Sequence, residues 1–274
     1  MKKVLSLISA IAISVTMLAG CAAKPTETEQ PAADANSLLG KDNVFVIGFD
    51  QNFPPFGYVG EDGEITGFDI ELAKEVAKRL GWEIGLQPID WDAKDLELES
   101  GTIDCIWNGF TMNGREDEYT WTVPYYDNSQ VFIVKTDSGI SEFSGLAGKT
   151  VAVQKDSSAL AALNSEENTE LLGSFGELIE VSEYNTAFMD LEQGAVDAVA
   201  LDAGVAAFQM EGRETEFTVL KQEISKEQYA IGFLLGNTEA KDAVEQELLK
   251  MADDGTVEKI AKEFVDTKNV CIIK

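Results

Sequence analysis

A nine-residue pattern occurs twice in the sequence, once in each half of the chain. Residues 98–106 and 191–199 both read Leu-Glu-x-Gly-x-apolar-Asp-x-apolar. In each copy the glycine is placed to end a helix, and the aspartate falls early in the strand that follows. Two copies in the same order of elements predict two structurally similar lobes.

The apolar residues from position 44 onward alternate between strand-like and helix-like spacing. Such alternation predicts α/β layering with mostly parallel sheets. The predicted extended segments are residues 44–49, 82–89, 103–107, 130–134, 150–154, a segment near 179, and 195–201. The predicted helices are residues 70–80, 93–99, 158–164, 187–192, 240–251 and 256–264.

The order of these segments predicts how the chain is divided. No strand follows the last two helices, so we expect them to return to the first lobe. The first lobe would then comprise residues 43–134 and 236–270, and the second lobe residues 135–235. The chain would cross between the lobes near residues 135–139 and 232–236, and these two strands would form a hinge that lets the lobes close around a ligand.

Residues 1–42 predict export and anchoring. Lys2 and Lys3 precede an apolar stretch, residues 4–19, that is shorter than the roughly 20 residues of a membrane-spanning helix. The stretch ends in Leu-Ala-Gly-Cys, so we expect residues 1–20 to be a lipoprotein signal peptide and Cys21 to carry lipid such as palmitate; an uncleaved anchor with a chance cysteine is the alternative. Residues 21–42, rich in Ala, Pro, Thr and Glu, predict a disordered tether. The body would lie on the extracellular face of the membrane, or on the periplasmic side in a cell with an outer membrane.

The composition argues against several partners and chemistries. With 49 acidic and 21 basic residues, the net charge is −28, which disfavours binding to nucleic acid and to anionic lipid surfaces. The chain has no histidine, the commonest general base and metal ligand, and we expect no catalytic residues, cofactor or metal site. Cys105 and Cys271 leave two readings open: one disulfide that pins the C-terminus to the first lobe, or a buried free thiol beside a frayed end.

Candidate ligand-binding residues follow the predicted strands, because ligands of open α/β sheets bind beyond the carboxyl ends of the strands. In the first lobe they are Asp50, Phe53, Trp91, Asn108, Gly109, Thr111 and Arg115. Arginine can grip a carboxylate with two parallel hydrogen bonds, whereas an ion pair with Glu116 or Glu118 is the structural alternative for Arg115. A surface turn around Phe53 and core packing of Trp91 are further alternatives.

The second lobe offers two candidate groups. Ser157 and Ser158 lead into the predicted helix 158–164, where they can cap the helix, hold a carboxylate, or do both. Asp202 directly follows the predicted strand 195–201, where its carboxylate could accept an ammonium group.

The sequence resembles the polar amino-acid branch of the extracellular solute-binding proteins of ABC importers. The resemblance runs from about residue 44 to residue 264 and rests on residues 67–73 (GFDIELA), 100–104 (SGTID), 124–126 (PYY), 148–154 (GKTVAVQ) and 199–202 (VALD). It implies a periplasmic-binding-protein-like fold of type II, in which two Rossmann-like lobes close over one amino acid.

The resemblance also implies a set of ligand contacts. Carried over by position, the ligand side chain would lie between Phe53 and Trp91, with its far end at Asp50. The backbone groups of the ligand would contact Asn108, Gly109 and Thr111. Its α-carboxylate would bind Arg115 and Ser158, and its α-ammonium would bind Asp202. Two features depart from the family pattern. The segment from Thr111 to Arg115 is one residue shorter than the usual Thr-x-Thr-x-x-Arg, and Asp156 stands where the family has glycine.

The resemblance thus implies a transport receptor that delivers a free amino acid to the permease subunits of an ABC transporter. We expect a monomer that binds a polar or cationic amino acid or cystine, with glutamate and aspartate less favoured. A dehydratase-like enzyme on the same fold is one alternative, which the absence of histidine disfavours. A sensor domain is the other, and it would require a transmembrane helix after the domain, whereas the sequence ends at Lys274.

Overall fold

The computed structural model describes residues 44–272. The predicted signal peptide (1–20), the predicted lipidation site Cys21 and the predicted tether (21–42) lie outside the described residues. Among residues 44–272, no helix has the length and apolar character needed to cross a membrane.

The first lobe is built on a five-stranded sheet in the order β5-β1-β6-β14-β7. Its strands are β1 (Val44–Phe49), β5 (Glu83–Pro88), β6 (Cys105–Ile106), β7 (Thr120–Trp121) and β14 (Gly232–Phe233). β1 is parallel to β5 and β6, and β14 is antiparallel to β6 and β7. A small antiparallel sheet of β2 (Asn52–Phe53), β3 (Gly57–Val59) and β4 (Ile65–Thr66) follows β1 in the chain.

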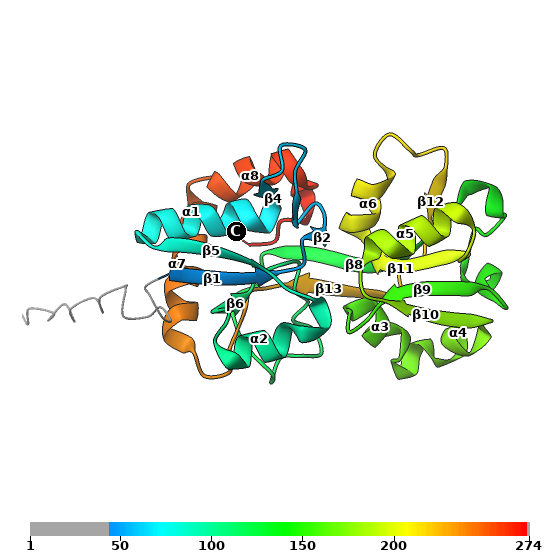
Figure 1. The fold of residues 1–274 in the computed structure, drawn as a ribbon, viewed down its shortest axis with the longest axis horizontal. Coiled ribbons are helices and arrows are strands. Elements are labelled where there is room, and N and C mark those ends of the chain that lie inside the picture. The colour runs from blue at the N-terminus through cyan, green and yellow to red at the C-terminus, as the bar shows by residue number, and fades with distance from the viewer. Residues whose placement is uncertain (1–43, 273–274) are drawn as a thin grey trace, which may run out of the picture. The chain divides into compact units, whose positions relative to one another are not determined.

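Four helices cover this sheet: α1 (Phe68–Leu80), α2 (Lys94–Ser100), α7 (Thr238–Asp253) and α8 (Thr256–Phe264). In Figure 1, α1 and α8 lie on one side of β1 and β5, and α2 lies on the other. α1 forms as predicted, because Ile70, Ala73 and Val76 recur at helical spacing and are fully buried. It ends at Gly81, which has the left-handed φ of 70° that favours glycine.

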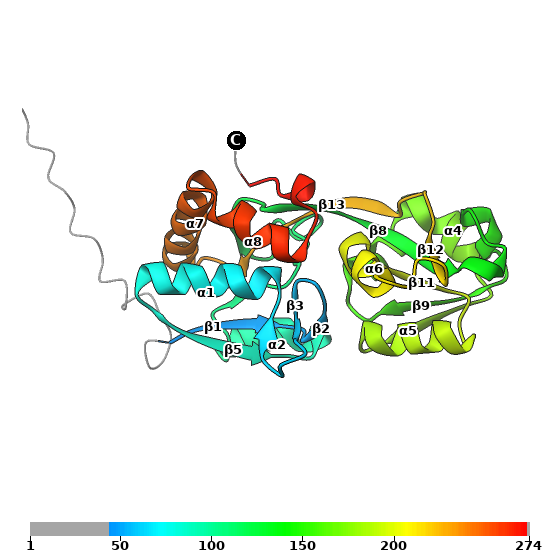
Figure 2. The same ribbon diagram turned by 90° about the horizontal axis from the view of Figure 1, so that it is seen from above.

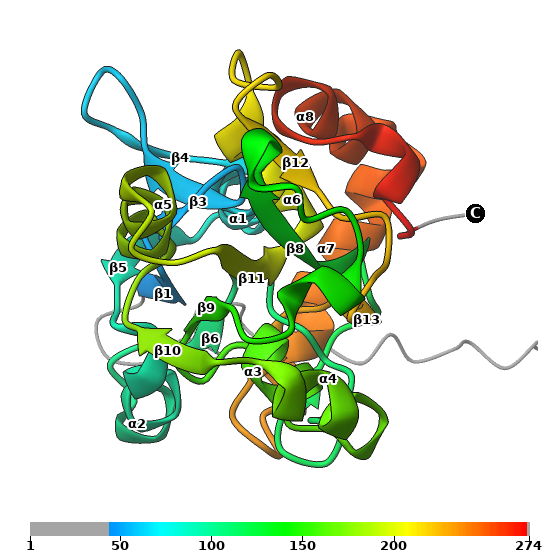
Figure 3. The same ribbon diagram turned by 90° about the vertical axis from the view of Figure 1, so that its right-hand side faces the viewer.

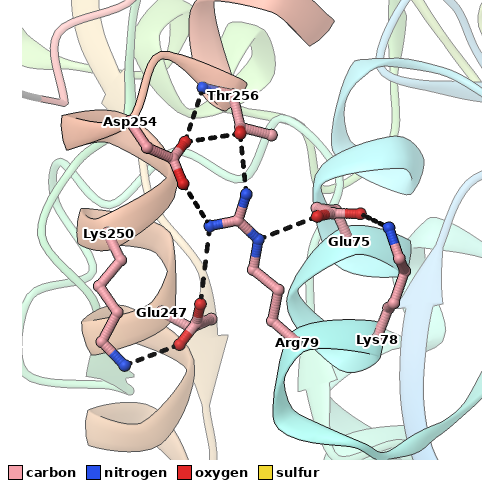
Figure 4. A network of polar contacts seen from close by, with 7 residues as sticks. All are labelled: Glu75, Lys78, Arg79, Glu247, Lys250, Asp254 and Thr256. Atoms are coloured by element: carbon pink, nitrogen blue, oxygen red, sulfur yellow. Dashed lines mark hydrogen bonds and ion pairs between the residues drawn. The ribbon is translucent and has the colours of Figure 1, made fainter.

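The C-terminal helices return to the first lobe, as expected, and one arginine of α1 ties them there (Figure 4). Arg79 Nε lies 2.9 Å from Glu75 Oε1 on its own helix, and its NH1 lies 2.7 Å from Asp254 Oδ2 and 3.7 Å from Glu247 Oε1. Its NH2 donates to Thr256 Oγ1 at 2.8 Å. Arg79 therefore links α1 to the end of α7 and the start of α8.

The second lobe has a sheet in the order β10-β9-β11-β8-β12, with β13 also paired to β8. Its strands are β8 (Tyr126–Lys135), β9 (Thr150–Gln154), β10 (Glu177–Val181), β11 (Ala198–Asp202), β12 (Phe217–Val219) and β13 (Ser225–Tyr229). Its helices are α3 (Ser158–Leu163), α4 (Thr169–Ser174), α5 (Tyr184–Gln193) and α6 (Ala203–Met210). Figures 1 and 3 show α5 and α6 on one side of β9 and β11, and α3 and α4 on the other.

β8 and β13 form the connection between the two lobes and run side by side (Figures 1 and 2). Their antiparallel register pairs Tyr126 with Tyr229, Asn128 with Glu227, and Gln130 with Ser225. This ladder is the two-strand hinge that the sequence predicted.

The positions of the two crossings differ from those expected. Residues 130–134, assigned from the sequence to the first lobe, pair with β11 in the sheet of the second lobe. The first crossing therefore lies before residue 130 and not near residues 135–139. The return crossing is also earlier, because β14 already belongs to the first sheet at Gly232. An apolar run identifies a strand, but its partner depends on contacts distant in sequence, and this is why the boundaries were misplaced.

The repeated nine-residue pattern makes the same local structure in both lobes. Gly101 and Gly194 end α2 and α5 with φ values of 72° and 76°. The following aspartates make matching pairs of hydrogen bonds to a neighbouring strand. Val46 N donates to Asp104 Oδ2 at 2.7 Å, and Thr150 N donates to Asp197 Oδ2 at 3.0 Å. In each case the amide of the aspartate donates back to the carbonyl of the same strand residue.

The two cysteines within residues 44–272 are free thiols. Cys105 is fully buried in β6, and Cys271 is half-buried beside Tyr125, whose carbonyl accepts from its amide. Burial raises the pKa of both thiols, that of Cys271 to about 12. The structure therefore has no disulfide between them.

Candidate functional site

A small cavity lies between the strand ends of the two lobes. Both lobes contribute to its wall, which is lined by Phe53, Trp91, Asn108, Gly109, Thr111, Arg115, Gln154, Ser157, Ser158 and Asp202. The structure therefore brings together every predicted ligand-binding residue except Asp50. Gln154, absent from the prediction, is the last residue of β9, so the strand-end argument that selected Asp202 could have found it as well.

Asp50 lies behind this wall and is buried at the end of β1. Gln154 Nε2 of the second lobe donates to Asp50 Oδ2 at 2.8 Å, and Asn52 N donates to Oδ1 at 2.8 Å. Burial raises the pKa of Asp50, and the nearby charges of Glu183 and Asp90 add to the effect, whereas these hydrogen bonds oppose it. Asp50 thus joins the two lobes through Gln154.

Asn108 and Gly109 each make a hydrogen bond within the first lobe. Asn108 Oδ1 accepts from Asp50 N at 3.1 Å, and Asn108 Nδ2 lies 2.6 Å from where a Cβ on Gly57 would stand. Gly109 N donates to Asp69 Oδ2 at 2.5 Å. Asn108 Oδ1 and the Gly109 amide thus have partners within the first lobe, whereas Asn108 Nδ2 is buried without a hydrogen-bond partner among the described residues.

Gly109 is required by its surroundings. Its φ is 53°, and a Cβ at this position would lie 2.7 Å from Cε1 of Phe53. Its hydrogen-bond acceptor, Asp69, is fully buried at the start of α1, and burial raises the pKa of Asp69 to about 7. The aromatic and glycine parts of the wall are therefore packed directly against each other.

Arg115 reaches the cavity despite the shortened segment before it. Its NH1 donates to Thr111 O at 3.1 Å, and its guanidinium lies 5.4 Å from the centroid of the Phe110 ring. No carboxylate within residues 44–272 forms an ion pair with Arg115, so the alternative of a surface ion pair does not describe this residue. Its positive charge is available to an anionic group in the cavity.

The two serines have different surroundings. Ser157 caps α3, because its Oγ accepts from Leu160 N at 3.2 Å. Ser158 Oγ instead faces other polar side chains: Thr111 Oγ1 of the first lobe donates to it at 3.1 Å, and Gln130 Nε2 donates to it at 3.0 Å. Both serines line the cavity, and Ser158 also contacts both lobes.

Asp202 supplies a buried carboxylate at the end of β11. Its Oδ1 accepts from Asn128 Nδ2 at 2.9 Å, from Gln130 Nε2 at 2.8 Å, and from the hydroxyl of Tyr229. Burial, together with the neighbouring Glu227, raises the pKa of Asp202 well above its ordinary value. The sequence analysis missed these partners; Asn128 and Gln130 are two residues apart in β8, so both side chains lie on the same, buried face of the strand.

Asp156 joins the lobes at the mouth of the cavity. It is the one residue other than glycine with a positive φ, 54°, in the described part of the chain, and this conformation favours glycine. Its carboxylate pairs with Lys94, and its carbonyl accepts from Trp91 Nε1 at 3.2 Å and from Arg115 NH2 at 3.5 Å. Because Lys94, Trp91 and Arg115 all belong to the first lobe, the structure is closed over the cavity.

Comparisons with known proteins point in one direction. Residues 45–267 match the bacterial extracellular solute-binding proteins, family 3. The L-cystine-binding protein TcyJ of Escherichia coli K12 is 28% identical over 261 residues, which cover 92% of each chain. The arginine-binding extracellular protein ArtP of Bacillus subtilis is 28% identical, over 85% of this chain and 90% of the relative. A substrate-binding protein of an ABC uptake transporter from Streptococcus pneumoniae, solved with bound histidine, has a TM-score of 0.79 at 30% identity, over 84% of this chain and 95% of that one.

Proposed function

Because the chain belongs to the bacterial extracellular solute-binding proteins of family 3, we propose that it captures one free amino acid outside the cell and delivers it to the permease subunits of an ABC transporter. One observation carries this proposal. Arg115 and Asp202 place a positive and a negative charge on one cavity, with Arg115 in one lobe and Asp202 in the other. An α-amino acid carries the complementary pair of charges, so it can bind both residues and hold the lobes together.

The side chains divide the ligand between the two lobes. Arg115 binds the α-carboxylate with two parallel hydrogen bonds, and the hydroxyl of Ser158 adds a third. Asp202 accepts the α-ammonium through Oδ2, because its Oδ1 is already surrounded by donors. Phe53 and Trp91 cover the ligand side chain from the first lobe.

The remaining wall favours a neutral polar or cationic side chain, or cystine. Asp50 lies just behind the wall, hydrogen-bonded to the lining residue Gln154, and the negative charges of Glu183 and Asp90 lie close to it. An additional carboxylate in that region would be repelled, so glutamate and aspartate are poor ligands. Relatives that bind cystine and arginine support this choice of class.

The family consists of binding proteins, so the dehydratase-like alternative is set aside. We further propose that lipid on Cys21 holds the protein at the extracellular face of the membrane and that it acts as a monomer. Mass spectrometry of the exported protein tests the lipid on Cys21, and light scattering tests the monomer.

A ligand screen tests the main proposal. The melting temperature of the purified protein is measured with each common amino acid and with cystine, and the best ligand is titrated by calorimetry. We expect a polar or cationic amino acid or cystine to raise the melting temperature, and Asp202→Asn to abolish the effect. A chain that no amino acid stabilises would refute the proposal.

A further inference from the structure

A second acidic side chain, Glu227, lies directly behind Asp202. Glu227 belongs to β13 and is 5% exposed, and Asp202 is 3% exposed. Two amide groups bridge the pair: Asn128 Nδ2 lies 2.9 Å from Asp202 Oδ1 and 2.7 Å from Glu227 Oε1. Gln130 Nε2 lies 2.8 Å from the first oxygen and 2.7 Å from the second. Glu227 is therefore part of the structure that fixes the position of Asp202.

The groups around the two carboxyls provide no positive charge. Their donors are the amides of Asn128 and Gln130 and the hydroxyl of Tyr229, all of which are neutral. Within residues 44–272, no lysine or arginine forms an ion pair with either carboxyl. Two ionised carboxylates this close in a buried site repel each other strongly, so the empty site is stable only if the pair keeps one proton.

The other titratable groups near the Asp202–Glu227 pair do not supply a compensating positive charge either. Burial and the negative charge of Asp202 raise the pKa of Tyr229 and of Tyr184, which stay neutral at physiological pH. Asp50 is the next nearby acid, on the side of Tyr184, and is itself held by Gln154. Arg115 lines the same cavity, where the ligand carboxylate is its expected partner.

The hydrogen bonds of Gln130 indicate that the network is incomplete without a further group. Its Nε2 has two hydrogens but lies near three acceptors: Asp202, Glu227 and Ser158. Its Oε1 is fully buried and has no hydrogen-bond partner among the described residues. A bound ammonium or a proton on the acid pair relieves this competition, because either reduces the demand for amide donors.

We propose that Glu227 is a positioning residue of the ammonium site, and that the Asp202–Glu227 pair exchanges its proton for the α-ammonium of the ligand. This inference rests on the proposed function. In the empty site the pair holds one proton and has a net charge of −1. In the loaded site both carboxyls are ionised, the ammonium contributes +1, and the net charge is again −1. The released proton passes to the solvent, so each bound amino acid displaces one proton.

Calorimetry tests this exchange directly. The best ligand of the screen, chosen so that it does not itself titrate between pH 5 and 8, is titrated in phosphate and in Tris, whose ionisation enthalpies differ. We expect up to one proton released per ligand, and an affinity that falls by up to tenfold per pH unit as the pH drops below the pKa of the pair. Glu227→Gln keeps the size and the acceptor oxygen of the side chain, and it should abolish the release and flatten the pH dependence.

Two controls make the result specific. Glu247→Gln alters a glutamate of similar burial, 7% exposed, that is paired with Arg79 and Lys250 away from the cavity, and it should leave the proton release unchanged. Infrared spectroscopy of the unmodified protein should show the carbonyl band of a protonated carboxyl that disappears on ligand binding, a readout that does not depend on folding of any variant.

The possible outcomes separate this inference from the proposed function. A protein that binds an amino acid without releasing a proton would overturn the exchange but leave the transport function intact. Release that persists in folded Glu227→Gln would also overturn it, because the proton would then come from Asp202 alone or from another acid such as Asp69 or Asp50 and not from a shared pair. A protein that binds no amino acid would contradict the proposed function itself.

Discussion

The ion pair between Lys94 and Asp156 acts across the mouth of the cavity, and removing it should weaken ligand binding. Lys94 is fully buried in the closed structure. Besides Asp156, the groups near its ammonium are Asp95 Oδ2, at 3.8 Å, and the Trp91 ring, whose centroid lies 5.4 Å away. When the lobes open, the Lys94 ammonium loses its contact with Asp156 and is hydrated by water instead. The ion pair therefore stabilises the closed form relative to the open one, and ligand affinity depends on that difference.

The magnitude follows from the burial of the two partners. Exposed ion pairs contribute about 0.2–1 kcal/mol, whereas breaking a fully buried pair costs about 3–5 kcal/mol. The side chain of Asp156 is 50% exposed and that of Lys94 only 2%, so we expect about 1–2 kcal/mol for this pair. Such a loss corresponds to an affinity about 5–30-fold lower. The left-handed φ of Asp156 has the same cost in both forms and cancels from the comparison.

The assay is a double-mutant cycle measured by calorimetry. Lys94→Met and Asp156→Gly should each lower the affinity by this factor, and the double variant should lose no more than either one alone. Asp156→Asn is the matched control, since it keeps the side chain without its charge and should resemble Asp156→Gly. Affinity of the unmodified protein should also fall with added salt more than that of the variants. Losses below twofold, or losses that simply add in the double variant, would refute the reasoning.

Three further predictions concern residues of the first lobe. Arg115→Lys should lower ligand affinity, measured by calorimetry, about 10–100-fold, because lysine cannot form two parallel hydrogen bonds to a carboxylate. The melting temperature of the ligand-free protein should not change. An unchanged affinity would exclude Arg115 from the site. Arg79→Ala should lower the free energy of unfolding in urea by about 1 kcal/mol while ligand affinity stays constant, and equal stability would contradict the role of this residue in holding α7 and α8. Burial raises the pKa of Asp69 from 3.8 to about 7, so its proton stabilises the folded state below about pH 4 and this contribution is lost as the pH rises to about 7. Asp69→Asn should therefore gain stability relative to the unmodified protein between these pH values, by up to about 4 kcal/mol, and parallel pH profiles of the two proteins in urea unfolding would contradict the assignment.

The sequence predicted the individual elements of the fold better than their partners. The period of apolar residues is a local property, and it located α1 and the two copies of the repeated pattern correctly. Residues 130–134 were also recognised as a buried strand. Nothing local distinguishes a strand of the first sheet from one of the second, however, and the crossing was therefore placed too late in the chain.

In the site, too, the positions of the residues could be predicted from the sequence, but their hydrogen-bond partners could not. Phe53, Arg115 and Asp202 could be predicted to converge because they follow strands of two sheets, and the carboxyl ends of those strands face the cavity between the lobes. Asn108 lines the cavity as predicted, but the sequence did not show that its Oδ1 accepts from the Asp50 amide inside the first lobe. Glu227 could not be predicted, because only the register of two strands distant in sequence brings it to Asp202.

The ladder between β8 and β13 links the binding site to the movement of the lobes. Asn128 and Glu227 stand opposite each other in this ladder, at the segment that must bend when the lobes open or close. The side chains that hold Asp202, the proposed ammonium-binding residue, therefore belong to the two strands of the hinge. A change of charge at this point acts where the motion originates, and a permease that contacts both lobes can read the occupancy of the cleft from the angle between them.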